Sequence, residues 1–196
     1  MTRLILLRHG ETTSNLDGRF QGSDNDHVSL TGLGHTQSRA AAEALQSLDP
    51  RLLWTSDSRR ARDTADHVGQ SCALTPTPDP RIREIDVGAF AGLTHAETEA
   101  RFGPRPWVYA NHGGESRADV AARFVPCLKE FATLVGPNDV AVVVSHSHAI
   151  RVATCVLTGW GLQAVDSLRT VPNGGWVELV ADQAAWQLAA YGSVPT

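Results

Sequence analysis

The sequence predicts an α/β fold with three layers, in which helices cover both faces of a mostly parallel central sheet. Two apolar runs, residues 4–7 and 140–144, predict buried strands, and each leads into a histidine. Elsewhere, shorter apolar runs alternate with segments of helical periodicity, which is typical of α/β proteins. If the two strands are neighbours, His9 and His146 meet at the carboxyl edge of the sheet, where open α/β folds bind ligands.

Length and composition narrow the class of protein. A chain of 196 residues, 42% hydrophobic and 19% charged, is expected to form one domain over residues 1–196. The net charge of −4 gives no reason to expect nucleic-acid binding. No apolar run approaches the roughly 18 residues of a membrane span, and no signal peptide is recognised. The three cysteines are odd in number and lie far apart, so a reduced cytoplasmic protein is expected.

The first part of the chain alternates between strand and helix signals. A polar loop over residues 13–29 is expected after the first strand. Thr31 is a suitable N-cap for a helix that ends before Pro50. Residues 51–55 predict a second strand, and residues 59–68 predict the helix that follows it.

The middle of the chain is richer in glycine and proline. A short strand is expected near residues 73–74, before a Pro-rich loop. Thr94 begins a short helix over residues 95–101, with Glu97 completing a capping box. Residues 86–116 as a whole are expected to form a lid or specificity insertion.

The last part contains the longest helical pattern and a hairpin. Residues 116–135 carry one apolar stripe, and Pro126 within it is expected to kink the helix. A helix over residues 150–157 should follow the second buried strand. Residues 176–180 and 185–190 could pair as a hairpin, whose open edge could mediate a homodimer.

The residues around the first histidine suit phosphate chemistry. Arg8 offers a planar fork of donors, and Gly10 allows a sharp turn or a close approach of the backbone. His9 follows a buried strand, at the edge of the sheet where open α/β folds bind ligands. A solvated arginine beside a structural histidine would give the same local pattern, so these residues alone leave both interpretations open.

Four segments of the chain resemble the histidine phosphatase (phosphoglycerate-mutase-like) family. Residues 8–12 match the first signature, and residues 56–61 resemble S-D-L-x-R-A with Ser58 in place of leucine. Residues 83–88 resemble R-E-x-x-x-G, and residues 144–147 resemble the last motif. The resemblance implies a phosphoglycerate mutase-like fold. It also implies a phosphomonoesterase that forms phosphohistidine, needs no metal or cofactor, and acts on a small phosphorylated metabolite such as a sugar or glycerate phosphate.

The resemblance assigns catalytic roles residue by residue. His9 would attack phosphorus, while Arg8, Arg60 and a preferably charged His146 would hold the phosphoryl group. Glu84 would protonate the leaving oxygen and then activate water. The register of the second motif selects Arg60 over the adjacent Arg59, and Asp86 is the competing carboxylate in the third motif.

The resemblance also suggests residues that bind the substrate. Asn15 stands six positions beyond the nucleophile and would donate a hydrogen bond, and Ser147 replaces a glycine and would narrow the pocket. Gln21 and Gly22 complete the predicted substrate-binding set. Segments that resemble the glucosyl-3-phosphoglycerate phosphatases within this family are residues 21–22, 92–96, 112–117 and 119–123.

Other functions stay open at this point. A cofactor-dependent phosphoglycerate mutase shares the motifs, although it carries more basic residues after the catalytic glutamate. A non-catalytic module that binds phosphorylated ligands is a further alternative. His148 forms an H-x-H pair with His146 but is expected to pack rather than bind metal. Trp107 and Tyr109 could contact substrate from the lid.

Overall fold

The centre of the molecule is a six-stranded sheet. The computed structural model describes residues 1–22, 28–104, 108–181 and 185–195. The strand order is β3-β2-β4-β1-β5-β6, with β3, β2, β4 and β1 parallel and the β5–β6 hairpin antiparallel beside β1. The mostly parallel sheet and the hairpin are therefore confirmed. The strands are β1 (Thr2–Arg8), β2 (Leu52–Thr55), β3 (Thr77–Pro78), β4 (Val140–Ser145), β5 (Trp176–Ala181) and β6 (Trp186–Ser193).

The two strands that end in histidines are direct neighbours. β1 and β4 pair in parallel, and Arg8 lies opposite Ser145 in the register. β4 is buried along its length and β1 is buried from Leu4 to Leu7, as expected for strands covered on two faces. His9 and His146 consequently follow the last paired residues at the same edge of the sheet, which confirms the convergence that the sequence predicted.

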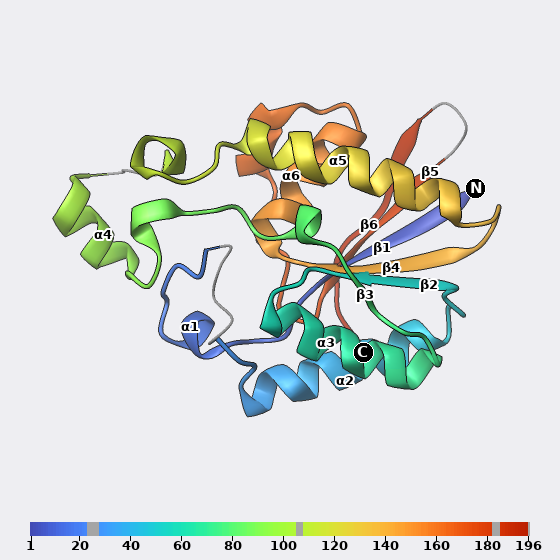
Figure 1. The fold of residues 1–196 in the computed structure, drawn as a ribbon. Helices are drawn as coiled ribbons and strands as arrows, with labels where there is room; N and C mark the ends of the chain where they lie inside the picture. Colours follow the sequence, from blue (N-terminus) through green and yellow to red (C-terminus); the bar gives the residue numbers. More distant parts are fainter. Residues whose placement is uncertain (23–27, 105–107, 182–184, 196) are drawn as a thin grey trace.

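Two pairs of long helices form the outer layers (Figure 1). Alternate side chains of β1 point to opposite faces, so Ile5 and Leu7 pack under one pair while Leu4 and Leu6 pack under the other. The pair below the sheet in Figure 1 is α2 (Gly32–Gln46) and α3 (Arg59–Cys72), and the pair above it is α5 (Arg117–Leu134) and α6 (Ser147–Leu157).

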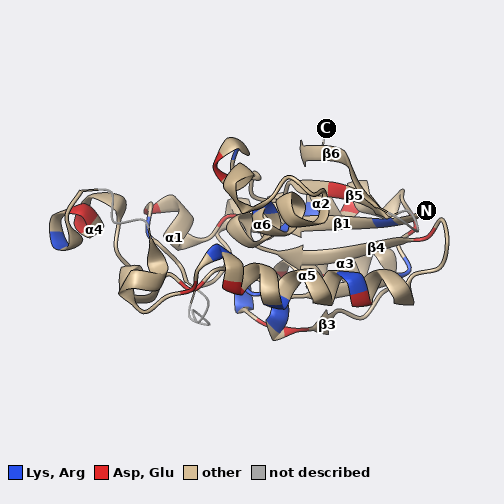
Figure 2. Cartoon of the chain, turned by 90° about the horizontal axis from the view of Figure 1, so that it is seen from above, with Lys and Arg blue, Asp and Glu red and all other residues tan. Residues whose placement is uncertain are grey.

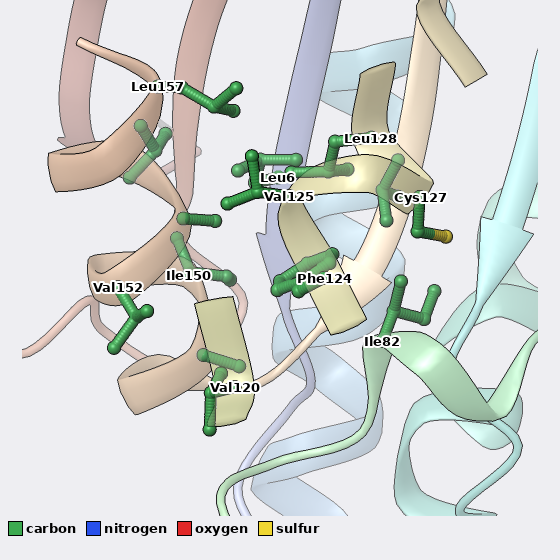
Figure 3. Close-up of a cluster of buried hydrophobic side chains, with 14 of the residues drawn as sticks. Leu6, Ile82, Val120, Phe124, Val125, Cys127, Leu128, Ile150, Val152 and Leu157 are labelled. Atoms are coloured by element: carbon green, nitrogen blue, oxygen red, sulfur yellow. The ribbon is translucent and has the colours of Figure 1, made fainter. Parts of the chain in front are cut away.

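The larger part of the core lies between α5, α6 and the sheet (Figure 3). Phe124 and Leu128 of α5 are completely buried, as is Ile150 of α6. Pro126 lies inside α5, but the helix continues through it to Leu134. This packing fixes the start of α6, which is the element that follows His146.

Local signals account for most helix ends and for the main errors of the prediction. Thr31 caps α2 as expected. The predicted loop after β1 contains a short helix, α1 (Thr13–Leu16), capped by Thr12. No strand forms at residues 73–74, because Ala73 adopts a left-handed conformation (φ 54°) that ends α3. The edge strand β3 forms a few residues later, within the predicted Pro-rich loop.

The region expected to be a lid lies beyond the carboxyl edge of the sheet. Its helix α4 (His95–Phe102) has the predicted Thr94–Glu97 capping box and lies at the end of the molecule away from the N-terminus (Figure 1). Basic residues (blue) and acidic residues (red) are intermixed along the chain, and α4 carries both kinds (Figure 2). None of the helices in the described ranges has the length and apolarity needed to cross a bilayer. The 3₁₀ turns are Pro80–Ile82, Gly88–Phe90, Tyr109–His112 and Leu162–Ser167.

Candidate active site

A small cavity of about 160 Å³ opens at the carboxyl edge of the sheet. Charged side chains from β1, α3 and the loop before Gly88 form part of its wall. The loop after α1 forms another part. Most of the predicted site residues therefore lie together around one hollow. Those that line it are Arg8, His9, Asn15, Gln21, Gly22, Arg60 and Glu84.

His9 is held in one orientation and one tautomer. Its side chain is 3% exposed, and Nδ1 lies 2.7 Å from the carbonyl oxygen of Gly10. A carbonyl can only accept, so Nδ1 carries the proton and Nε2 keeps its lone pair. The backbone is also fixed, because the N–H of His9 donates to the carbonyl of Ser145 (3.1 Å) and Asn173 donates to the carbonyl of His9 (3.0 Å). His9 therefore presents a free ring nitrogen at the cavity.

The electrostatic surroundings keep His9 neutral. Burial holds the pKa of His9 well below its ordinary value, and the positive charges of Arg60 and Arg8 lower it further. The hydrogen bond to Gly10 opposes this shift without reversing it. The unprotonated ring that a nucleophile requires is therefore the favoured form at neutral pH.

Two guanidinium groups supply positive charge to the cavity. Arg60 reaches it from α3, is 1% exposed and donates from Nη2 to the carbonyl of Gly22 (3.0 Å). Arg8 donates from Nη1 to the carbonyl of Val171 (2.7 Å). Burial lowers the pKa of Arg8 to about 10, which leaves it charged at neutral pH. Two planar cations beside an imidazole suit a phosphoryl group.

The structure places Arg60 in the cavity and Arg59 outside it. The side chain of Arg59 is about half exposed, with its Nε 3.7 Å from a carboxylate oxygen of Asp63 one helical turn later. Arg60 faces the opposite way and is among the largest fully buried side chains. The register chosen for the second motif thus agrees with the geometry.

Glu84 is oriented by backbone donors at the start of α6. Its Oε1 accepts from the N–H groups of Ile85 and Ala149, each at 2.9 Å, and its Oε2 accepts from the N–H of His148 at 3.1 Å. The first turn of a helix is a favourable place for a carboxylate. These hydrogen bonds hold the Glu84 carboxylate at the cavity wall.

Asp86, the competing carboxylate, is used elsewhere. Its Oδ1 accepts from the N–H of Gly88 (2.8 Å), and Asp86 does not line the cavity. Arg123 of α5 holds the backbone of residues 81–84 in place. It donates to the carbonyls of Arg81, Arg83 and Glu84 and to the carboxylate of Glu115.

His146 lies beside His9, behind the cavity wall. The ring centroids are 5.1 Å apart at 64°, and His146 is 0% exposed. Its Nε2 lies 3.4 Å from Ser58 Oγ, and its Nδ1 has no hydrogen-bond partner among the described residues. Neither His146 nor Ser147 is among the residues that line the cavity, so their direct contact with substrate stays a prediction.

The protein's own groups favour a neutral His146. Burial, then Arg60 and His9, hold the pKa of His146 well below its ordinary value. This differs from the charged ring that the sequence suggested, because the neighbouring cations come from distant segments. A phosphate dianion would offset that repulsion and favour proton uptake by this ring.

The two buried histidines should make the fold less stable in acid. Their pKa values in the folded protein are below the value of about 6.5 expected in the unfolded chain, so below that pH the unfolded state binds protons that the native state does not. We expect the free energy of unfolding to fall as pH decreases from about 7 to about 5, by up to about 1.4 kcal/mol per pH unit for each histidine. Urea unfolding across this range measures it. A His9→Asn/His146→Asn variant should have a shallower pH dependence, and an unchanged slope would contradict the assignment.

Gly10 allows the loop after β1 to approach α2 closely. A Cβ at this position would collide with the carbonyl oxygen of Gly34 and lie 2.7 Å from Ser38 Oγ. The close approach, rather than a positive φ, is therefore why glycine is needed here. The N–H of Gly10 also donates to Thr64 Oγ1 (3.1 Å), which ties the loop to α3.

A Gly10→Ala substitution should destabilise the protein by about 1–3 kcal/mol, because it overpacks a backbone contact. It should also lower kcat, since relief of the clash displaces His9. Urea unfolding and steady-state assays measure the two effects. Gly32→Ala is the matched control, because a Cβ there meets nothing within 4 Å and should leave both unchanged. Equal stability of the two variants would contradict the packing argument.

Asn15 and several residues missed by sequence reasoning complete the wall. Asn15 Oδ1 accepts from Thr12 and from Asn173 Nδ2 (3.1 Å), which leaves its own Nδ2 as the donor toward the cavity. Some of the residues that sequence reasoning missed are sequence neighbours of predicted site residues, and this proximity was the signal that could have identified them. Trp107 lies outside the described residues. Tyr109, which the sequence suggested could contact substrate from the lid, lines the cavity, and the missed lining residues are Arg19, Phe20, Ile85, Val87 and His148.

His148 is engaged by a cation rather than poised as a metal ligand. Its Nδ1 lies 3.2 Å from Nη2 of Arg151, so the ring accepts there. Within the ranges the structure describes, no group of three His, Cys, Asp or Glu side chains could hold a metal ion.

The fold and the cavity together define an α/β protein with a histidine-centred site for a phosphoryl-sized anion. Comparison with known proteins gives the family. The model of the histidine phosphatase superfamily (branch 1) matches residues 4–194. The chain belongs to this superfamily.

Individual relatives are also similar over most of their length. A glucosyl-3-phosphoglycerate phosphatase of Mycolicibacterium vanbaalenii is 38% identical over 196 aligned residues, covering 93% of this chain and 86% of the relative. Phosphoserine phosphatase 1 of Hydrogenobacter thermophilus is 33% identical, covering 81% and 77%. The structure of a mycobacterial glucosyl-3-phosphoglycerate phosphatase in complex with VO3 superposes with a TM-score of 0.88 at 33% identity, covering 97% of this chain and 99% of that one.

Proposed function

We propose that this phosphatase hydrolyses small phosphate monoesters in two steps, through a phosphohistidine at His9. The observation that carries the proposal is the state of His9: a buried, neutral imidazole whose Nδ1 is occupied by Gly10 and whose Nε2 is free at a cavity lined by Arg8 and Arg60. Such a nitrogen can attack phosphorus at neutral pH.

In the first step, Nε2 of His9 would form a bond to phosphorus while the bond from phosphorus to the ester oxygen breaks. Charge develops on the equatorial oxygens, where Arg8 and Arg60 would stabilise it. The departing oxygen would take its proton from Glu84. Glu84 must therefore be protonated when this step begins. It would gain that proton either when the substrate binds or from the monoanionic form of the phosphate ester.

In the second step, water would attack the phosphohistidine. Glu84, now ionised, would take a proton from that water, and the bond between phosphorus and Nε2 would break. Inorganic phosphate would leave and His9 would return to its starting state. Asn15 Nδ2 would contribute a further hydrogen bond to the phosphoryl oxygens, and His146 would support the ring of His9 from behind.

For the substrate, a glycerate or sugar phosphate is the leading candidate, and glucosyl-3-phosphoglycerate is the first compound to test. Relatives carrying that name share more identity with this chain than the phosphoserine phosphatases do. A proposed lid over residues 86–116 supplies Tyr109 to the cavity and would set specificity. The mutase alternative has less support, because the phosphoglycerate mutases among the relatives are 31% identical or less.

A panel of sugar, glycerate and nucleotide monophosphates, assayed with and without chelator, tests the proposal. We expect stoichiometric release of inorganic phosphate, unaffected by chelator, with the highest kcat/KM for a glycerate or sugar phosphate. Loss of activity with chelator, recovered on adding a divalent metal, would contradict the mechanism. Transfer of phosphate between positions of an organic substrate, without release, would support the mutase instead.

We further propose a single domain that works in the cytoplasm. Cys72, Cys127 and Cys155 are all free thiols, which suits a reducing compartment. The sheet ends on β6, whose outer edge could pair two copies of the chain. Light scattering across a concentration series distinguishes a monomer from this dimer.

A further inference from the structure

A second, larger pocket of about 860 Å³ adjoins the small cavity. The two share Ile85, Tyr109 and His148 as lining residues, so they adjoin one another at those residues. A phosphate monoester with its phosphorus at His9 would extend its alcohol portion past Tyr109 into the larger pocket. The groups that line this pocket therefore select the leaving group.

Most of the charges that line the larger pocket are neutralised within the protein. Arg117 holds Asp166 with two hydrogen bonds, from Nη1 at 3.0 Å and from Nη2 at 2.5 Å. Glu115 is held by Arg123 through bonds of 2.8 and 2.7 Å. These pairs account for both carboxylates and for one of the two arginines of the pocket wall, and the remaining arginine is Arg151.

Arg151 has only neutral hydrogen-bond partners among the described residues, although its charge also helps to lower the pKa of Asp166. Its Nη1 makes two long hydrogen bonds of 3.4 Å, to the carbonyls of Val165 and Leu168, and its Nη2 lies 3.2 Å from Nδ1 of His148. Its Nε is buried without a hydrogen-bond partner. A guanidinium with long, neutral contacts is poised for a better acceptor, and carboxylates match its planar fork.

Arg151 is also close enough to the phosphate cavity to act with it. Burial is the main cause of the lowered pKa of Arg8, and repulsion from the charge of Arg151 lowers it further. His148 connects the two sites, because its backbone N–H holds Glu84 while its ring contacts Arg151. A ligand with two anionic groups would relieve the repulsion, with phosphate at Arg8 and a second anion at Arg151.

We propose that Arg151 binds a carboxylate on the leaving group, so that the enzyme prefers phosphate monoesters of hydroxy acids to those of neutral alcohols. The inference rests on the proposed phosphatase function and names its substrate class. His148 is the positioning residue, since its Nδ1 accepts from Arg151 and keeps the guanidinium at the boundary between the two pockets.

A matched pair of substrates tests the inference. 3-Phosphoglycerate and glycerol 3-phosphate differ only in carrying a carboxylate or a hydroxymethyl group. We expect the wild-type ratio of kcat/KM for the two to favour 3-phosphoglycerate by about tenfold to a hundredfold, the range of a charge-assisted hydrogen bond. Arg151→Gln should bring the ratio close to one, and Arg151→Lys should keep part of it.

Arg39→Gln is the control, because it removes the same charge from an exposed position on α2 whose Nη2 contacts only Thr36. It should leave the ratio unchanged. A ratio measured on one preparation does not depend on the folded fraction, so a partly unfolded variant remains informative. A wild-type ratio near one, or an equal loss on both substrates in Arg151→Gln, would overturn the inference. Persistence of turnover in a His9→Ala variant would instead overturn the proposed mechanism and leave the ratio test standing.

Discussion

Replacing His9 with alanine should reduce kcat for every substrate by about four orders of magnitude or more. The substitution removes a ring nitrogen that is free of a hydrogen bond and placed at the small cavity together with Arg8 and Arg60. Arg8 and Arg60 would still bind phosphate, so the affinity for inorganic phosphate should fall much less than kcat. Phosphate release from an aryl phosphate measures the loss of kcat. The affinity of the variant for inorganic phosphate is compared with the constant for competitive inhibition by phosphate in the wild type.

The matched control is His67→Ala on α3, whose ring contacts His35 away from the cavity. It should retain wild-type kcat. Circular dichroism should show that both variants are folded. If His9→Ala kept more than about one per cent of wild-type activity, the nucleophile would have to be another group.

Replacing Glu84 with glutamine should lower kcat by about two to four orders of magnitude, and the loss should depend on the leaving group. The amide has the same shape, and its oxygen can still accept hydrogen bonds from the N–H groups of Ile85 and Ala149, but its NH2 group cannot accept from His148 and cannot transfer a proton. An aryl phosphate releases a stable phenolate and needs little acid catalysis. An alkyl phosphate needs full protonation, so we expect a larger loss of kcat with alkyl than with aryl substrates.

Asp86→Asn is the control for the acid assignment. Asp86 stabilises the turn at Gly88 but does not reach the cavity, so its removal should lower kcat far less than Glu84→Gln does. Should Asp86→Asn show the leaving-group dependence while Glu84→Gln does not, the roles of the two carboxylates would have to be exchanged.

Local sequence signals were enough to predict the parts of the site that depend on strand ends. The apolar runs before His9 and His146 predict two buried strands, and the histidines meet because the fold makes these strands parallel neighbours. Capping signals at Thr31 and Thr94 also predict helix starts, because a cap is a contact within four residues.

The rest of the site depends on contacts between distant segments. The pKa of His146 is lowered first by burial and then by the charge of Arg60, which comes from another helix. Arg151 and Arg117 are both arginines near the same pocket, yet only the fold shows that Asp166 neutralises one of them. The left-handed Ala73 displaced the predicted strand, and a left-handed residue other than glycine or asparagine has no reliable sequence signal.

The chemical position of the transferred phosphate tests the mechanism most directly. Rapid acid-free quenching of the enzyme with substrate, followed by mass spectrometry and phosphorus NMR, locates the phosphoryl group on the chain. We expect it on Nε2 of His9, because Nδ1 donates to the carbonyl of Gly10 and is not available to attack. Phosphate on Nδ1 of His9, on any other residue, or on no residue during steady turnover would contradict this mechanism.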